Sequence, residues 1–267
     1  MTNGQTRRTV LGGMAAGVGL IGMADQTNAQ AQTGGKTLVL VHGAWHGGWC
    51  WRRVSDLLER QGHKVFTPTL TGLGERSHLM SKNIRLATHV TDVVNLMKWE
   101  GLADVVLCGH SYGGMVVSGV AEQTAGKIAS IVFLDAFVPQ NGEAVTDLTG
   151  AATLDLLRAA QAKGDIGIPA RTAASFNVNE KDRAWVDALC APHPINTFLD
   201  KMTLSGASER IAKKSYIRAL NNANPGFDKA MARAKADPSW RTYEIACGHD
   251  VMVDMPERLT EILLEVA

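Results

Sequence analysis

The sequence predicts an α/β fold in which a mostly parallel β-sheet carries helices on both faces. Two observations predict this class. Short apolar runs of four to seven residues recur along the chain, as expected for strands buried on both faces of a parallel sheet. Between these runs, apolar residues follow the helical period. Such alternation of strand and helix is typical of a parallel sheet covered by helices.

The first strand candidate is the apolar run at residues 37–41, which ends in glycine-rich sequence. Glycine directly after a buried apolar run indicates a turn at the end of the strand. The other predicted strands cover residues 64–67, 104–108 and 128–134, with weaker candidates at 214–220 and 241–246.

Three segments show the clearest helical period. The first two end before the stop signals Gly62 and Gly101, and the third follows Pro256, a residue suited to the first helical turn. Because the third has apolar residues at i, i+3, i+4 and i+7, we expect the chain to end on an amphipathic helix. The apolar positions are Trp51, Val54, Leu57 and Leu58 in the first segment, Val90, Val93, Val94 and Met97 in the second, and Leu259, Ile262, Leu263 and Val266 in the third.

The alternation is interrupted between residues 139 and 204, where Gly, Pro and Ala are frequent, helical segments are short and no clear buried strand occurs. We interpret residues 139–204 as an inserted helical cap. The core is then formed by residues 36–138 and 205–267. A cap in this position is expected at the carboxyl edge of the sheet, where open α/β folds bind ligands.

Residues 1–31 differ from the rest of the chain. Arg7 and Arg8 precede a Gly- and Ala-rich apolar run at 12–24, and the small residues of the sequence AQA at 29–31 are spaced for cleavage. This pattern resembles a twin-arginine export signal; a disordered basic tail is the alternative. A membrane anchor is disfavoured because a spanning helix needs ~20 apolar residues. We therefore expect export to the periplasm or the medium.

Charge and composition exclude other partner classes. Lys and Arg number 27 and Asp and Glu 26, so no basic footprint favours nucleic acid, and no later stretch is long and apolar enough for the mature protein to enter a membrane. The cysteines form no CxxC pair, and free thiols are favoured. His42 and His46 invite a metal interpretation, but no further ligand accompanies them, so we expect neither metal nor cofactor. The cysteines are Cys50, Cys108, Cys190 and Cys247.

The sequence Gly109-His110-Ser111-Tyr112-Gly113 follows a predicted strand and precedes a segment compatible with a helix. This Gly-x-Ser-x-Gly pattern is typical of a nucleophile elbow, a sharp strand-to-helix turn that exposes the serine hydroxyl. The flanking glycines avoid a clash at the turn. Ser111 is therefore the candidate nucleophile, with an ordinary turn as the alternative.

The expected oxyanion hole uses two backbone amides. One belongs to Tyr112, directly after the nucleophile, and we expect the other to belong to Ala44, in the glycine-rich loop after the first strand. His249 lies between the last predicted strand and the final helix, where an imidazole is placed to act as general base. Other histidines lack this context: His63, His78, His89, His110 and His193.

From Lys36 to its end, the chain resembles the α/β-hydrolase branch that contains plant methyl-ester esterases, including methyl salicylate esterases, hydroxynitrile lyases and many bacterial esterases. The resemblance implies the α/β-hydrolase fold and a nucleophile-histidine-acid triad. Besides the elbow, it rests on the sequences VHGAW at 41–45, PTLTGLGER at 68–76, FLDAFVP at 133–139 and GHD at 248–250.

Lyases of this branch carry a threonine after the first-strand histidine and a lysine after the catalytic histidine. This chain has Gly43 and Asp250 at those positions. Because a carboxylate opposes a departing cyanide, hydroxynitrile lyase activity is disfavoured.

The triad acid is the main departure from the family pattern. The resemblance implies an aspartate after the strand predicted at 214–220, but Asn221 and Asn222 stand there. An amide can orient imidazole but does not stabilise imidazolium, and loss of that charge costs ~10⁴ in turnover in a serine protease. We predict Asp135, which ends the run 128–134, as the acid. Asp228 and a triad without a carboxylate are the alternatives.

The sequence therefore predicts a serine carboxylic ester hydrolase that works through an acyl-enzyme. Small and apolar residues in the cap favour an uncharged, fairly hydrophobic small-molecule ester, with aromatic esters as candidates. A ligand-binding hydrolase-fold protein without catalysis, and an amide or carbon–carbon bond hydrolase with the same triad, remain alternatives. The oligomeric state is not determined by the sequence.

Overall fold

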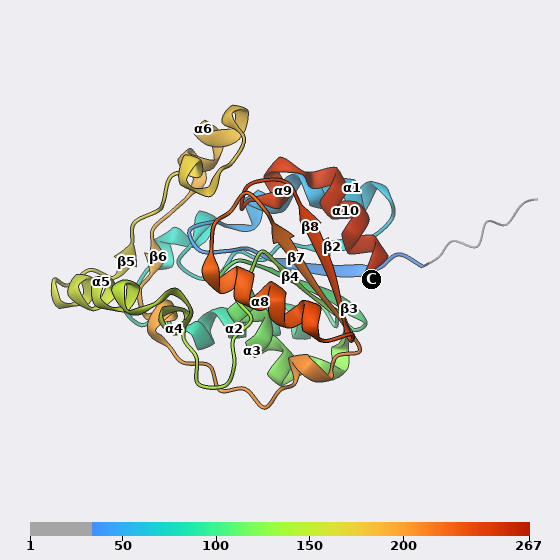
Figure 1. The fold of residues 1–267 in the computed structure, drawn as a ribbon, viewed down its shortest axis with the longest axis horizontal. Helices are drawn as coiled ribbons and strands as arrows, with labels where there is room; N and C mark the ends of the chain where they lie inside the picture. Colours follow the sequence, from blue (N-terminus) through green and yellow to red (C-terminus); the bar gives the residue numbers. More distant parts are fainter. Residues whose placement is uncertain (1–33) are drawn as a thin grey trace, which may run out of the picture. The chain divides into compact units, whose positions relative to one another are not determined.

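Six parallel strands form the central sheet of the protein, for which a computed structural model describes residues 34–267. The strand order is β2-β1-β3-β4-β7-β8, with each neighbouring pair parallel (Figure 1). The predicted export signal, residues 1–31, lies outside the described residues. The strands are β1 (Thr37–Val41), β2 (Lys64–Phe66), β3 (Val105–His110), β4 (Ile128–Leu134), β7 (Lys213–Ala219) and β8 (Trp240–Ile245).

Helices cover both faces of this sheet because side chains alternate along each strand. In β1, Val39 and Val41 pack into the same apolar cluster as residues of α2 and α3, whereas Leu38 and Leu40 join residues of α1 and α10 (Figure 1). The main helices are α1 (Arg52–Arg60), α2 (Leu86–Trp99), α3 (Gly113–Thr124), α8 (Pro225–Ala236), α9 (Val251–Asp254) and α10 (Pro256–Glu265), with 3₁₀ turns at η1 (Gly48–Trp51), η2 (Gly74–Leu79), η3 (Ala125–Lys127) and η5 (Ser208–Arg210).

The predicted fold class is confirmed, and the boundaries of β1 and β4 are as predicted, whereas those of the other four strands differ by one or two residues. Strand β3 runs two residues beyond the prediction, to His110, because Gly109 pairs with Val41 of β1 and His110 with Leu134 of β4. Neighbouring strands thus extend β3 past the end of its apolar run. Ser111, the candidate nucleophile, directly follows His110, the last paired residue of β3.

The described segment between β4 and β7 holds four α-helices and one small antiparallel ribbon, of which α5, α6 and the ribbon lie away from the main sheet (Figure 1). No strand was expected in the predicted cap, 139–204. The ribbon was missed because two-residue strands leave no apolar run to detect. No helix of residues 34–267 combines the length and apolarity needed to cross a membrane. The elements are α4 (Val145–Thr149), α5 (Ala151–Ala162), β5 (Gly167–Ile168), η4 (Ala173–Phe176), α6 (Glu180–Leu189), β6 (His193–Pro194) and α7 (Asn196–Leu199).

Candidate active site

Ser111 lies in the sharp turn between β3 and α3. Its φ of +54° is in the left-handed region, which is strained for a residue other than glycine. A Cβ at Gly109 would lie 2.6 Å from the carbonyl oxygen of Gly113, so the turn closes too tightly for a side chain there. The amide of Ser111 donates to the carbonyl of Leu134 at 3.1 Å, which joins the turn to the end of β4. The local geometry is that of a nucleophile elbow.

His249 lies beside this turn, on the loop after β8. Its amide donates to the carbonyl of Phe176 at 2.8 Å, and its carbonyl accepts a hydrogen bond from Nε2 of His110 at 3.1 Å. The described residues form no hydrogen bond between Ser111 and the His249 ring. Such bonds are often long before substrate binds. His110, which its sequence context did not single out, therefore links the elbow to the loop that carries His249.

Asp135 directly follows β4 and is fully buried. Its Oδ2 atom lies 2.6 Å from Nδ1 of His249, although the two residues are 114 positions apart in sequence. A carboxylate at this distance holds the histidine in the tautomer that leaves Nε2 free. The structure therefore brings together the histidine and the acid that the sequence predicts for the triad.

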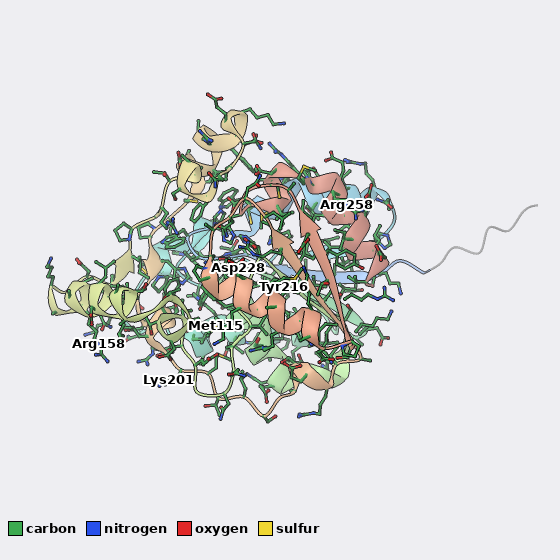
Figure 2. The ribbon with its side chains drawn as sticks, in the orientation of Figure 1. Met115, Arg158, Lys201, Tyr216, Asp228 and Arg258 are labelled. Carbon is green, nitrogen blue, oxygen red and sulfur yellow. The ribbon has the colours of Figure 1, made fainter. Side chains whose placement is uncertain are left out.

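The alternative acid, Asp228, is held elsewhere. It lies on α8 with 65% of its side chain exposed (Figure 2) and pairs with Nη2 of Arg218 at 2.8 Å. No contact joins it to His249 within the described residues. Asp228 was the alternative to Asp135 in the sequence, and the structure places it within α8, paired with Arg218 and not with His249.

Three further groups surround the Asp135 carboxylate. Oδ1 accepts hydrogen bonds from Nη1 of Arg218 at 2.5 Å and from the amide of Ala219 at 3.1 Å. Oδ2 also accepts one from Nδ2 of Asn222 at 2.7 Å. Sequence reasoning missed these contacts. Arg218 offered a signal, since an arginine within the apolar run of a buried strand needs a buried partner.

One predicted oxyanion amide, that of Tyr112, directly follows the serine in the chain, and the other, that of Ala44, lies on a loop beside the elbow. A Cβ at Gly43 would lie 2.9 Å from Cβ of Ser111, so the loop that carries Ala44 passes directly against the elbow. Within residues 34–267, the amides of Ala44 and Tyr112 donate no hydrogen bond to another residue. Free N–H groups next to the serine are what an oxyanion requires.

His46 and Asp250 form a second buried aspartate–histidine pair, and Asp250 directly follows His249 in the chain. Nε2 of His46 lies 3.0 Å from Oδ2 of Asp250, and Nδ1 of His46 lies 2.8 Å from the carbonyl oxygen of Ala44. Both ring nitrogens face acceptors, so only the doubly protonated imidazolium satisfies them. Burial alone would lower the pKa of His46, but the charge of Asp250 and the hydrogen bond to it raise that pKa well above its usual value. Sequence reasoning did not predict this pair.

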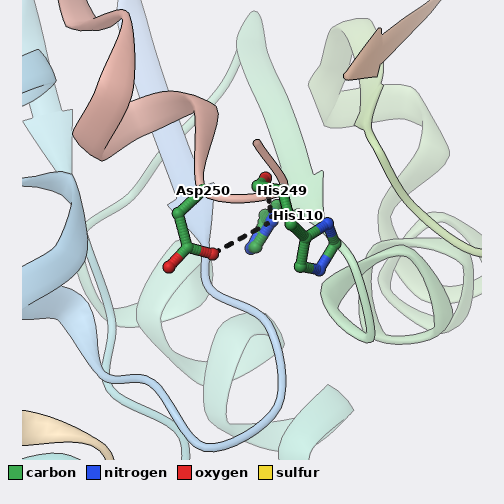
Figure 3. Close-up of side chains that lie close together, drawn as sticks. All are labelled: His110, His249 and Asp250. Carbon is green, nitrogen blue, oxygen red and sulfur yellow. Dashed lines mark hydrogen bonds and ion pairs between the residues drawn. The ribbon is translucent and has the colours of Figure 1, made fainter. Parts of the chain in front are cut away.

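His110, His249 and Asp250 have potential metal-ligand atoms within 4.8 Å of one another (Figure 3). Each of the three side chains has a hydrogen-bond partner among the described residues, while Nδ1 of His110 and Oδ1 of Asp250 have none. Nε2 of His110 donates to the carbonyl of His249, Nδ1 of His249 faces Asp135, and Asp250 pairs with His46. Burial and the neighbouring His249 lower the pKa of His110, which keeps that ring neutral. The geometry is that of a hydrogen-bonded network, and it does not fit a metal centre.

Residues between β4 and β7 pack against the loop of Ala44 and against His249, and the serine itself is nearly buried. Ser111 is 8% exposed and His249 is 5% exposed. Trp45, next to Ala44, has a φ of +67° and makes three hydrogen bonds to the segment 168–193: from its indole to the carbonyl of Ile168 (3.1 Å), from its amide to Nδ1 of His193 (3.4 Å), and to its carbonyl from the amide of Ala191 (2.8 Å). Aromatic rings gather here; Trp45 packs on Phe176 and Phe198, and Phe176 and Phe227 pack on His249.

Comparison with known proteins agrees with this geometry. A model of the alpha/beta hydrolase family matches residues 38–262. The chain is 41% identical over 239 residues to a carbendazim hydrolyzing esterase from Nocardioides sp. (strain SG-4G), covering 84% of this chain and 97% of that protein. It is 28% identical over 246 residues to putative methylesterase 11, chloroplastic, from Arabidopsis thaliana, covering 86% of this chain and 63% of that protein.

Among solved structures, an extracellular alpha/beta-hydrolase from a Paenibacillus species superposes with a TM-score of 0.77 at 25% identity, covering 87% of this chain and 99% of that chain. Its title describes homology to tobacco salicylic acid binding protein 2. These relatives confirm the resemblance expected from the sequence. Because the family model matches most of its length, the chain belongs to the α/β-hydrolase family.

Proposed function

We propose that this protein is a serine carboxylic ester hydrolase in which Ser111 is the nucleophile, His249 the general base and Asp135 the triad acid. The observation that carries the proposal is the 2.6 Å contact between Asp135 and His249, on a loop packed against the strained turn of Ser111. The esterase names of the relatives support the same reaction.

In the proposed reaction, Oγ of Ser111 attacks the ester carbonyl carbon while Nε2 of His249 takes the serine proton. The amides of Ala44 and Tyr112 donate to the resulting oxyanion. When the tetrahedral intermediate collapses, His249 returns the proton to the departing alcohol. Water then attacks the acyl-enzyme with His249 again as base, which releases the carboxylic acid and restores Ser111.

The surroundings of the serine support a small, hydrophobic and aromatic ester as substrate. Trp45, Phe176, Phe198 and Phe227 give the surroundings of His249 and the loop of Ala44 an aromatic, apolar character, which favours a hydrophobic aromatic ester. The relative that is 41% identical is named for its hydrolysis of carbendazim, an aromatic carbamate ester. Carbendazim is therefore the first substrate to test beyond p-nitrophenyl esters.

The test is rapid-mixing hydrolysis of p-nitrophenyl acetate by the wild type and Ser111→Ala. We expect a burst of p-nitrophenol equal to the enzyme concentration and a mass increase of one acetyl group, both absent in Ser111→Ala. Ser118→Ala is the matched control, because Ser118 is a buried serine on α3 whose hydroxyl, within residues 34–267, bonds only the carbonyl of Gly114. Circular dichroism checks the fold of each variant.

A lack of burst and turnover with any ester by the folded wild type would favour the ligand-binding alternative. That alternative was motivated by the neutral Asn221 and Asn222, and the carboxylate of Asp135 beside His249 argues against it. If matched amides, or substrates cleaved at a carbon–carbon bond, are turned over faster than esters, the protein is instead an amide or carbon–carbon bond hydrolase with the same triad.

We further propose that residues 1–31 export the protein by the twin-arginine route. The pair Arg7 and Arg8 followed by the weakly apolar run supports this. Cells that produce the Arg7→Lys, Arg8→Lys variant should retain the protein in the cytoplasm. An unchanged location in fractionated cells contradicts the proposal.

A further inference from the structure

Asp135, His249 and Asn222 meet in a triangle of polar atoms. Oδ2 of Asp135 lies 2.6 Å from Nδ1 of His249 and 2.7 Å from Nδ2 of Asn222, and Nδ2 of Asn222 lies 3.0 Å from Nδ1 of His249. Two N–H groups therefore share one carboxylate oxygen. Asn222 touches the base at hydrogen-bond distance without being its hydrogen-bond partner, because both nitrogens are donors toward Asp135.

The other oxygen of the carboxylate is held independently of this triangle. Oδ1 accepts from Nη1 of Arg218 and from the amide of Ala219. An asparagine at residue 135 would keep both bonds through its Oδ1 and would turn an N–H group toward residue 222. A carboxylate at residue 222 would then accept from that group and from Nδ1 of His249. The arrangement would be the same triangle with the charge moved to its other corner.

We propose that Asn222 is a positioning residue for His249, and that a carboxylate at residue 222 can replace the one at residue 135. This inference rests on the proposed function. Asn222 donates to Oδ2 of Asp135, which fixes the carboxylate in the orientation that His249 requires. The segment that carries Asn222 is anchored in turn, because Nη2 of Arg218 donates to the backbone carbonyl of Asn222 at 2.5 Å.

The experiment compares kcat and KM for p-nitrophenyl acetate across four variants. Asp135→Asn should lower kcat by roughly 10³ to 10⁴, as for a lost charge behind the base. Adding Asn222→Asp to Asp135→Asn should restore kcat by about 10²-fold, since most of the effect of the charge returns. The matched control adds Asn221→Asp instead. Asn221 is the exposed neighbour, and its hydrogen bonds within residues 34–267 are made through its backbone, so this variant should stay as slow as Asp135→Asn.

The fourth variant, Asn222→Ala, tests positioning without a charge change. We expect kcat to fall by about 10-fold with KM nearly unchanged, the effect of losing about one hydrogen bond to a charged group. The downfield proton resonance of Nδ1 of His249 should shift in Asn222→Ala, vanish in Asp135→Asn and return in the double variant with Asn222→Asp.

Equal kcat values for the folded Asn222→Asp and Asn221→Asp double variants would overturn the charge exchange. If the exchanged variant does not fold, an unchanged kcat and resonance in Asn222→Ala would overturn the positioning role. A failure of the proposed function can be told apart from a failure of this inference. If the protein is not an esterase, the wild type itself will show no acylation by p-nitrophenyl acetate.

Discussion

Two buried aspartate–histidine pairs, Asp135 with His249 and His46 with Asp250, meet at the successive residues 249 and 250 and differ in their hydrogen bonds. His249 faces Asp135 through Nδ1, and Nε2 forms no hydrogen bond within residues 34–267. His46 faces Asp250 through Nε2 and the carbonyl of Ala44 through Nδ1. In the described part of the chain, the imidazole of His249 therefore has one ring nitrogen without a partner, whereas both ring nitrogens of His46 have a partner.

The difference teaches that an aspartate beside a histidine does not by itself make a catalytic base. A proton shuttle needs one ring nitrogen without a protein partner, and of the two paired histidines His249 alone has one within residues 34–267. The second pair instead joins the loop of Ala44 to the loop of His249. Breaking the first pair should therefore slow the reaction, whereas breaking the second should mainly destabilise the fold.

The largest expected difference between the pairs is in turnover. Asp135→Asn should lower kcat by roughly 10³ to 10⁴, whereas Asp250→Asn should lower it by less than about 10-fold, because within residues 34–267 Asp250 forms its hydrogen bond with His46 and none with the His249 ring. Steady-state hydrolysis of p-nitrophenyl acetate measures both. Equal losses in the two variants would show that the pairs are not functionally distinct.

The next effect is on stability. Asp250→Ala should lower the free energy of unfolding by about 3 to 5 kcal/mol, the usual result of removing one partner from a buried ion pair. Asp250→Asn should cost about 1 kcal/mol, because its amide can donate to Nε2 of a neutral His46. Urea unfolding at pH 7 measures both. A loss as large in Asp250→Asn as in Asp250→Ala would contradict this account.

The stabilising effect of the second pair should depend on pH. Asp250 raises the pKa of His46 in the folded state, so this contribution is fully present below the unfolded value of about 6.5 and is lost as pH rises through the folded pKa. The wild type should therefore exceed Asp250→Asn in stability by more at pH 6 than at pH 9. Urea unfolding at both pH values tests this. A constant difference would mean that His46 does not change its charge in this range.

The smallest expected effect concerns the segment over the site. Trp45→Phe removes the hydrogen bond from the indole to the carbonyl of Ile168, which should weaken the packing of residues 139–204 on the loop of Trp45 by about 1 kcal/mol. Proteolysis within residues 139–204 should then be about 5-fold faster. Trp49→Phe is the control, because its buried indole N–H has no partner among residues 34–267. The same acceleration in both variants would assign the effect to lost packing.

Features confined to a short stretch of chain were predictable. The strand runs, the period of the last helix and the elbow around Ser111 depend on neighbouring residues, and the structure has each of them. The small ribbon of β5 and β6 was not predictable, because two-residue strands are defined only by their pairing. The catalytic roles of Ser111, His249, Asp135, Ala44 and Tyr112 stay predictions until the variants are measured.

The sequence by itself determined the α/β class, the elbow and the position of His249 near the end of the chain, because periodicity and turn chemistry are local. Only the tertiary structure decided which acid each histidine meets. Asp135 reaches His249 because the strands β4, β7 and β8 lie side by side, with their carboxyl ends at one edge of the sheet. Asp250, next to His249 in sequence, turns instead to His46, 204 residues away. Hydrogen bonds between distant segments depend on how strands are ordered in the sheet, which residue spacing does not encode.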